Sequence, residues 1–375
     1  MAKIWAVVKD TGGTKAVLPV VVALRALGHE VQVIANGISV TQVGDDQRAA
    51  GFISVTTAGE VLERLGAPPH MLVTSMCSEG GVGRDLVPLV RPHNTKVVAV
   101  QDFYGAEMLR AWAALEHRPD YICVNDSVGA EIVVRAWSDF TPERVWITGF
   151  PALDRYAALY KPNATNTLMD EALEQSCGIP PGTTRVLFCG EKEHTGHTMA
   201  ELVAALNEIG HPVALIPRMH PAMTRVAPQE VEPTETALRG FNSGYIVHNS
   251  ERFTTDELIL TAEVVVSMSS TSLMEAAVCR RKALAILYPD HGARRFQEVT
   301  GFLPSDKPLI PEVPVVELGC CAKATNREEL TAVMRRLLRD GPDADMLAAQ
   351  KYHFKVDGLN AHHAAQRITA LLKQC

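Results

Sequence analysis

One short stretch of the chain concentrates hydroxyl groups next to an acid. In SMSSTSLME, Ser269, Ser270 and Thr271 follow the apolar run VVVS, and Glu275 lies inside the apolar-periodic stretch that comes next. This pattern predicts a buried strand, a turn, and a helix whose first amides are unpaired. Hydroxyls beside free amides suit a diphosphate, and a carboxylate one turn later can accept hydrogen bonds from both ribose hydroxyls. A capping box made by Ser272 and Glu275 would explain the acid without a ligand.

Two further loops in the same half carry groups that suit phosphate. CGEKEHTGHT places Gly190 and His194 between a strand and a helix, and IPRMHP places Arg218 and His220 at the end of the next strand. Arginine donates two parallel hydrogen bonds to phosphate oxygens, so a guanidinium beside an imidazole suits a diphosphate or a departing phosphate. The same sequence would also arise if the arginine were on the surface and the histidine bonded to the backbone, with no ligand present.

The first half opens with a glycine turn, DTGGTK, that holds Gly12 and Gly13. Glycines let the backbone approach a ligand closely, or they simply make a tight turn. The turn lacks the Gly-x-Gly-x-x-Gly spacing of dinucleotide sites and the Gly-Lys-Ser/Thr ending of triphosphate loops. These absences argue against an oxidoreductase and against a kinase.

Acids in the first half are candidates for a general base. Asp102 ends the strand VAVQD, where its carboxylate could take a proton from an acceptor hydroxyl; helix capping is the alternative role. Glu79, beside Ser78 in TSMCSEGG, is a second candidate, and Asp10 and Glu107 come next.

Strand and helix patterns alternate along the chain in two halves. The order strand, glycine turn, helix, Gly-His, strand occurs near the start and again from residue 185, where LNEIGHPVALIP resembles LRALGHEVQVIA. Continuous apolar runs separated by helical patterns are typical of parallel strands covered on both faces. We therefore expect an α/β protein of two doubly wound, Rossmann-like domains. The expected segments are a first domain at 1–157, a linker at 158–184, a second domain at 185–350, and a C-terminal helix at 351–375 that could pack back on the first domain.

Composition narrows the classes of partner. A net charge of −7 over 375 residues argues against a dedicated nucleic-acid binder, and no run of about 18 apolar residues occurs. The N-terminus lacks a signal peptide, so we expect a cytoplasmic protein. The eight cysteines form no Cys-x-x-Cys pair, so neither a zinc site nor a disulfide framework is expected.

Several segments together resemble the two-domain nucleotide-sugar enzymes of the GT-B fold. They are GFPALDRY, RMHP, SSTSLMEAA and RKALAILYPDHGARRF, and the likeness is to bacterial polysaccharide glycosyltransferases, lipid-A-disaccharide synthases and UDP-N-acetylglucosamine 2-epimerases. The resemblance implies two domains facing each other across a cleft. It implies a nucleotide-sugar substrate, with UDP the expected nucleotide, bound mainly by the second domain.

The resemblance also suggests roles for the candidate residues. Ser269, Ser270 and Thr271 would bind the diphosphate and Glu275 the ribose, with Gly190, His194, Arg218 and His220 near the phosphates and Gly12 and Gly13 approaching the donor from the first domain. Asp102, Glu79 and His220 would be the catalytic candidates. No metal and no further cofactor is expected, because helix dipoles and side-chain cations can stabilise the leaving diphosphate. Contact with a membrane surface and a homodimer stay open.

Departures from the epimerase pattern favour a glycosyltransferase acting on an unidentified acceptor. Epimerases carry His-x-Glu-Ala-Gly-x-Arg where this chain has VQDFYGAEM, and Gly-Thr-Arg-Pro-Glu where it has TGGTK. An epimerase is the first alternative. A protein that kept the fold and binds nucleotide-sugars without chemistry is the second.

Overall fold

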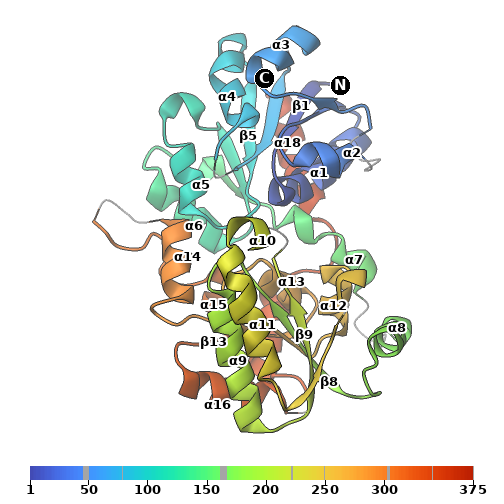
Figure 1. The fold of residues 1–375 in the computed structure, drawn as a ribbon. Helices are drawn as coiled ribbons and strands as arrows, with labels where there is room; N and C mark the ends of the chain where they lie inside the picture. Colours follow the sequence, from blue (N-terminus) through green and yellow to red (C-terminus); the bar gives the residue numbers. More distant parts are fainter. Residues whose placement is uncertain are drawn as a thin grey trace. The chain divides into compact units, whose positions relative to one another are not determined.

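The computed structural model describes residues 1–44, 50–77, 79–160, 167–220, 223–248, 250–301, 305–339 and 341–374 (Figure 1). Ser78 lies outside the described residues, and the side chain of Glu107 is also outside them. The chain forms two compact units, which we call unit 1 and unit 2. Unit 1 comprises Met1–Ala158, Val299–Pro311 and Asp357–Cys375, and unit 2 comprises Leu159–Glu298 and Glu312–Val356.

Unit 1 is built on a parallel sheet of seven strands in the order β3-β2-β1-β4-β5-β6-β7. Its strands are β1 (Lys3–Val8), β2 (Glu30–Ala35), β3 (Ile53–Ser54), β4 (Met71–Ser75), β5 (Lys96–Val100), β6 (Tyr121–Val124) and β7 (Val145–Ile147). Its longer helices are α1 (Thr11–Ala26), α3 (Ala58–Leu65), α4 (Val82–Val90), α6 (Ser127–Ala136) and α18 (Asn360–Leu372), with α2 (Ser39–Gly44) and α5 (Ala106–Ala111) shorter. The inner strands are apolar and buried along most of their length, as expected where helices cover both faces.

The last helix, α18, belongs to unit 1 and packs on α1. Two contacts position it. The imidazole of His29 lies 3.0 Å from the hydroxyl of Thr369, and the carboxylate of Asp154 accepts hydrogen bonds from the amides of Asn360 and Ala361 at 3.1 and 2.7 Å. Asp154 therefore satisfies two of the amides that a helix start leaves without intrahelical partners.

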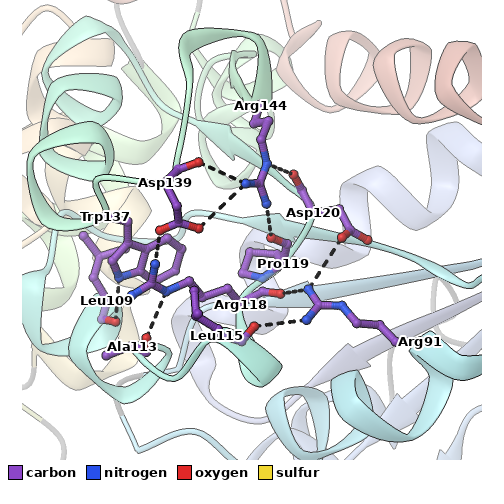
Figure 2. A network of polar contacts seen from close by, with 10 residues as sticks. All are labelled: Arg91, Leu109, Ala113, Leu115, Arg118, Pro119, Asp120, Trp137, Asp139 and Arg144. Carbon is purple, nitrogen blue, oxygen red and sulfur yellow. Dashed lines mark hydrogen bonds and ion pairs between the residues drawn. The ribbon is translucent and has the colours of Figure 1, made fainter.

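Arginines tie together the amino ends of β5, β6 and β7 in unit 1 (Figure 2). Arg144 donates to the carbonyls of Asp120 and Pro119 at 2.8 and 3.1 Å, and Arg118 forms an ion pair with Asp139. The guanidinium of Arg118 also lies 5.2 Å from the ring centre of Trp137. Because these cations bond loop carbonyls, they stabilise the amino edge of the sheet. Ligands of parallel α/β folds bind at the opposite, carboxyl edge.

Unit 2 is built on a second parallel sheet, of six strands in the order β10-β9-β8-β11-β12-β13. Its strands are β8 (Thr184–Cys189), β9 (Val213–Arg218), β10 (Gly244–Ile246), β11 (Val264–Ser267), β12 (Lys282–Ile286) and β13 (Ala322–Ala324). Its longer helices are α8 (Thr167–Cys177), α9 (Thr195–Ile209), α11 (Val231–Arg239), α16 (Arg327–Leu337) and α17 (Ala344–His353). Shorter ones are α10 (Met223–Val226), α12 (Thr255–Thr261), α13 (Ser272–Val278) and α15 (Pro314–Glu317).

Two helices span the boundaries between the units along the chain, α7 (Tyr156–Leu159) and α14 (Gly292–Thr300). The predicted class, α/β with two doubly wound sheets, is confirmed. Strands β3 and β13 were not predicted, because runs of two and three residues are too short to show an alternation of apolar and polar positions.

Candidate functional site

The register of the unit 2 sheet brings three of the predicted loops to one edge. Cys189 at the end of β8 lies opposite Arg218 at the end of β9. On the other side of β8, the hydroxyl of Ser267 at the end of β11 donates to the carbonyl of Cys189 at 2.6 Å. The loops that follow these strands therefore begin together at the carboxyl edge of the sheet, where parallel α/β folds bind ligands.

Ser269 is held by an acid that the sequence reasoning did not select. The Glu191 carboxylate accepts hydrogen bonds from the amide of Ser269 at 2.5 Å and from its hydroxyl at 2.9 Å. Burial raises the pKa of Glu191, and the two bonds from Ser269 oppose that shift. Both donors of Ser269 thus point at Glu191. The signal was in the sequence, because Glu191 ends a strand in the same way that Asp102 does.

Glu275 does not belong to a capping box. Helix α13 is capped by Thr271, whose side chain makes no capping hydrogen bond, so Ser272 is the first helical residue and Glu275 the fourth. A capping box needs the hydroxyl at the cap position and the acid three residues later, so the Ser272 and Glu275 interpretation is wrong. The Glu275 residue is only 9% exposed. Glu275 is therefore a mostly buried acid in the first turn of α13.

The charges of Arg218 and Glu275 both shift the pKa of one buried thiol, that of Cys189. Burial raises the pKa of Cys189 to about 12; Ser272 and the cation of Arg218 lower it, while the Glu275 carboxylate raises it. These electrostatic effects indicate that a cation and an anion from different loops lie near the end of β8. Arg218 also donates to the carbonyl of Ser250 at 3.3 Å, which orients its guanidinium.

His220 follows Arg218 by two residues and is half-buried. Burial, then the charge of Lys192, lowers the pKa of His220, so its imidazole is uncharged at neutral pH. A neutral imidazole can donate one hydrogen bond and accept another, but it adds no charge to a phosphate site.

The start of α9 is occupied by a carboxylate of the protein itself. The amides of His194 and Gly196 donate to the two carboxylate oxygens of Glu230 at 2.9 and 2.8 Å. His194 takes the left-handed conformation, with φ of 59°. A Cβ on Gly190 would lie 2.9 Å from the methyl of Thr195, so packing against α9 is sufficient to require glycine there.

In unit 1, the carboxyl edge of the sheet encloses Asp102. The residue is 7% exposed, and its Oδ1 has no hydrogen-bond partner within the described part of the chain. Burial and, second, the charge of Asp10 raise the pKa of Asp102 well above its ordinary value. Helix α5 is capped at Gly105, so Asp102 does not cap it and the capping alternative is wrong.

Gly12 and Gly13 bring the first turn of α1 against the neighbouring strands. The carboxylate of Asp10 caps this helix by accepting from the amide of Gly13 at 2.7 Å. A Cβ on Gly13 would lie 2.2 Å from the hydroxyl oxygen of Ser75, and one on Gly12 would lie 2.8 Å from Oδ2 of Asp102. Close packing inside unit 1 therefore accounts for both glycines.

Replacing Gly13 with alanine is expected to lower the free energy of unfolding by about 1–3 kcal/mol, because the added methyl must displace Ser75 or the helix. Thermal melting measures this. Gly59 in α3 is the matched control, since an added Cβ there meets nothing closer than 3.8 Å. Gly59→Ala should keep or raise the melting temperature, because alanine is the better helix former. Equal melting of the two variants would contradict the packing account.

Glu79 differs from Asp102 in exposure. Its side chain is 81% exposed and forms an ion pair with Lys9 at 3.1 Å. Glu79 is therefore open to solvent, whereas Asp102 is enclosed by the protein.

Within the described ranges, no group of three or more histidines, cysteines or acids is arranged to hold a metal ion. The same residues include no helix with the length and hydropathy needed to cross a membrane. Of the cysteines that the structure describes, all are free thiols, and only Cys177 is not buried.

No protein-family model matches the chain, and no curated protein sequence does so either. Solved structures do match over nearly its whole length. MnaA of S. aureus in complex with UDP has a TM-score of 0.68 at 15% identity, covering 100% of this chain and 98% of that one. The UDP-GlcNAc 2-epimerase of Neisseria meningitidis bound to UDP-GlcNAc has a TM-score of 0.63 at 12% identity, covering 100% of both chains.

A glycosyltransferase of Rickettsia africae is also similar, with a TM-score of 0.64 at 10% identity, covering 99% of this chain and 98% of that one. At such identities a likeness in structure establishes the fold and leaves the activity open. The chain therefore has the GT-B fold, which epimerases and glycosyltransferases of nucleotide-sugars share.

Proposed function

We propose that the protein is a glycosyltransferase that takes a sugar from a nucleotide-sugar, with UDP the expected nucleotide. The observation that carries the proposal is the mostly buried Glu275, which stands in the first turn of α13 and lies, like Arg218, near the end of β8. A carboxylate accepts hydrogen bonds, and the hydroxyls of a ribose are suitable donors.

The diphosphate would be held by Ser270, Thr271 and Arg218. Ser269 supports this loop through Glu191, because both of its donors are already used. The sequence expectation had Ser269, Ser270 and Thr271 all binding the diphosphate. The proposal keeps this role for Ser270 and Thr271 and gives Ser269 a supporting role. His220 and His194 remain candidates for contacts near the phosphates.

Acceptor activation is assigned to unit 1. Asp102 would take the proton from the acceptor hydroxyl as the sugar bond forms and the nucleoside diphosphate leaves. Its raised pKa suits a proton acceptor, because a more basic carboxylate binds a proton more tightly once it is ionised.

An epimerase is the second candidate, and one observation favours it. Asp10 and Asp102 are coupled acids at one edge of the unit 1 sheet, and inversion at a sugar carbon needs groups that both remove and return a proton. The GT-B fold serves both activities, so the reaction must be measured.

The test is incubation with UDP-N-acetylglucosamine and with other UDP, GDP, CMP and ADP sugars in D2O, followed by proton and phosphorus NMR. A transferase releases the nucleoside diphosphate in step with a new glycoside on an added acceptor. An epimerase needs no acceptor and introduces deuterium at the inverted carbon. Binding without turnover with any acceptor would leave a binding protein, and a calorimetric titration without binding of any nucleotide-sugar would refute the proposal.

A further inference from the structure

A second buried polar side chain stands beside Asp102 in unit 1 without partners. Asn125 directly follows β6, is 8% exposed, and has both Nδ2 and Oδ1 buried with no hydrogen-bond partner among the residues described. Folded proteins leave few buried polar atoms unpaired. Such an atom loses its hydrogen bonds to water on folding, and this costs free energy unless the protein replaces them. Two such atoms on one side chain indicate that Asn125 hydrogen-bonds to a ligand.

The sheet register places Asn125 next to Asp102. Val100 of β5 lies opposite Cys123 of β6, so the residues two positions further, Asp102 and Asn125, leave the sheet as neighbours. The backbone between them is held in place, because the amide of Gln101 donates to the carbonyl of Cys123 at 2.9 Å and the amide of Asn125 donates to Oε1 of Gln101 at 3.4 Å. Two neighbouring strand ends therefore carry three polar atoms without partners among the described residues: Oδ1 of Asp102, and Nδ2 and Oδ1 of Asn125.

The chemistry of these atoms selects the ligand. A carboxyl oxygen and a carbonyl oxygen accept hydrogen bonds, and the amide Nδ2 donates two. A hydroxyl group both donates and accepts, so neighbouring hydroxyls of a sugar or polyol can pair with all three atoms. A phosphate, which offers only acceptors when fully ionised, would leave both oxygens unpaired.

We propose that Asn125 and Asp102 together bind hydroxyl groups of a sugar or polyol in unit 1. If the protein is a glycosyltransferase, as proposed above, this ligand is the acceptor. The identification of the ligand as the acceptor therefore rests on the proposed function. Asn125 is the binding residue, which holds the hydroxyl in line with the carboxylate of Asp102.

The substitution Asn125→Leu separates this role from a structural one. Leucine has nearly the shape of asparagine and removes the unpaired polar atoms, so the melting temperature should stay the same or rise. Asn36 is the matched control, because it is a buried asparagine directly after β2 whose Nδ2 donates to the carbonyl of Val8 at 3.1 Å. Asn36→Leu loses that bond and should melt lower by a few degrees.

Ligand binding is measured by saturation-transfer NMR with glycerol and with the methyl glycosides of glucose and N-acetylglucosamine. The wild-type protein and Asn36→Leu should bind at least one of these probes, and Asn125→Leu should bind it about tenfold more weakly, the effect of losing one or more hydrogen bonds. Absence of binding by the wild-type protein, or equal binding by Asn125→Leu, would overturn the proposal. So would a fall in melting temperature for Asn125→Leu like that of Asn36→Leu, because it would show an internal partner or a structural water.

UDP binding by the same variants keeps the two proposals apart. Unit 2 carries the expected nucleotide site, so UDP should bind equally to the wild-type protein and to both variants. Loss of probe binding with UDP binding intact supports the role of Asn125. Failure of the wild-type protein to bind UDP would refute the proposed function, while the glycoside titration would still decide whether Asn125 and Asp102 bind hydroxyls.

Discussion

Asp102→Asn is expected to lower turnover by roughly a hundredfold to ten-thousandfold, the usual contribution of general acid or base catalysis, without weakening nucleotide-sugar binding. Asparagine has the size of the carboxyl group and still offers a carbonyl oxygen, but it cannot accept the acceptor proton. Initial rates of UDP release measure turnover, and calorimetry with UDP measures binding. Retained turnover would move the role to Asp10, Glu79 or Glu107.

The pH dependence of the wild-type rate is a second measurement of the same role. The catalytic form of a base is its ionised form, and burial together with Asp10 raises the pKa of Asp102. The rate should therefore rise as the pH increases through that raised pKa. A rate that is already independent of pH from about 5 upward would indicate a base with an ordinary carboxyl pKa and would contradict the assignment.

Stability provides the control for Asp102→Asn. A carboxyl with a raised pKa binds its proton more tightly in the folded state than in the unfolded state, where the pKa is about 3.9. The free energy of unfolding of the wild-type protein therefore falls as the pH rises from that value to the raised pKa. Asparagine carries no such penalty, so the variant should melt no lower than the wild-type protein at neutral pH. A variant that melts much lower would make its lost activity uninformative.

Glu275→Gln should weaken UDP binding by about 1–3 kcal/mol, because a charged acceptor of two ribose hydroxyls becomes a neutral amide with one acceptor oxygen. Calorimetric titration with UDP measures the loss. Glutamine keeps the size of the side chain in a site that is 9% exposed, so packing changes little.

The ribose itself supplies the control for Glu275. Wild-type protein should bind 2′,3′-dideoxy-UDP more weakly than UDP, while Glu275→Gln should bind the two nucleotides with nearly equal affinity, since the interaction is already lost. If the variant still discriminates between them as strongly as the wild-type protein does, another residue binds the ribose.

Local patterns were sufficient to predict the order of strands and helices and the loops where chemistry should occur. The apolar runs of β5 and β11 and the turn before α13 were predicted, because the period of apolar residues is a property of neighbouring positions. The start of α12 carries a capping box that is equally local, formed by Thr254 and Glu257 three positions later. The capping box at Ser272 was wrong, because the helix begins at Ser272, one residue earlier than that motif requires.

The sequence by itself determined the α/β class, the two doubly wound halves and the acids and hydroxyls at strand ends, since each depends on residues close together in the chain. Only the tertiary structure decided which of these groups meet. Glu191 bonds Ser269 across 78 positions, and Asp102 comes to lie beside Asn125 because β5 pairs with β6. Strand order and register set these neighbours, and they follow from the packing of whole elements, which no short stretch of sequence encodes.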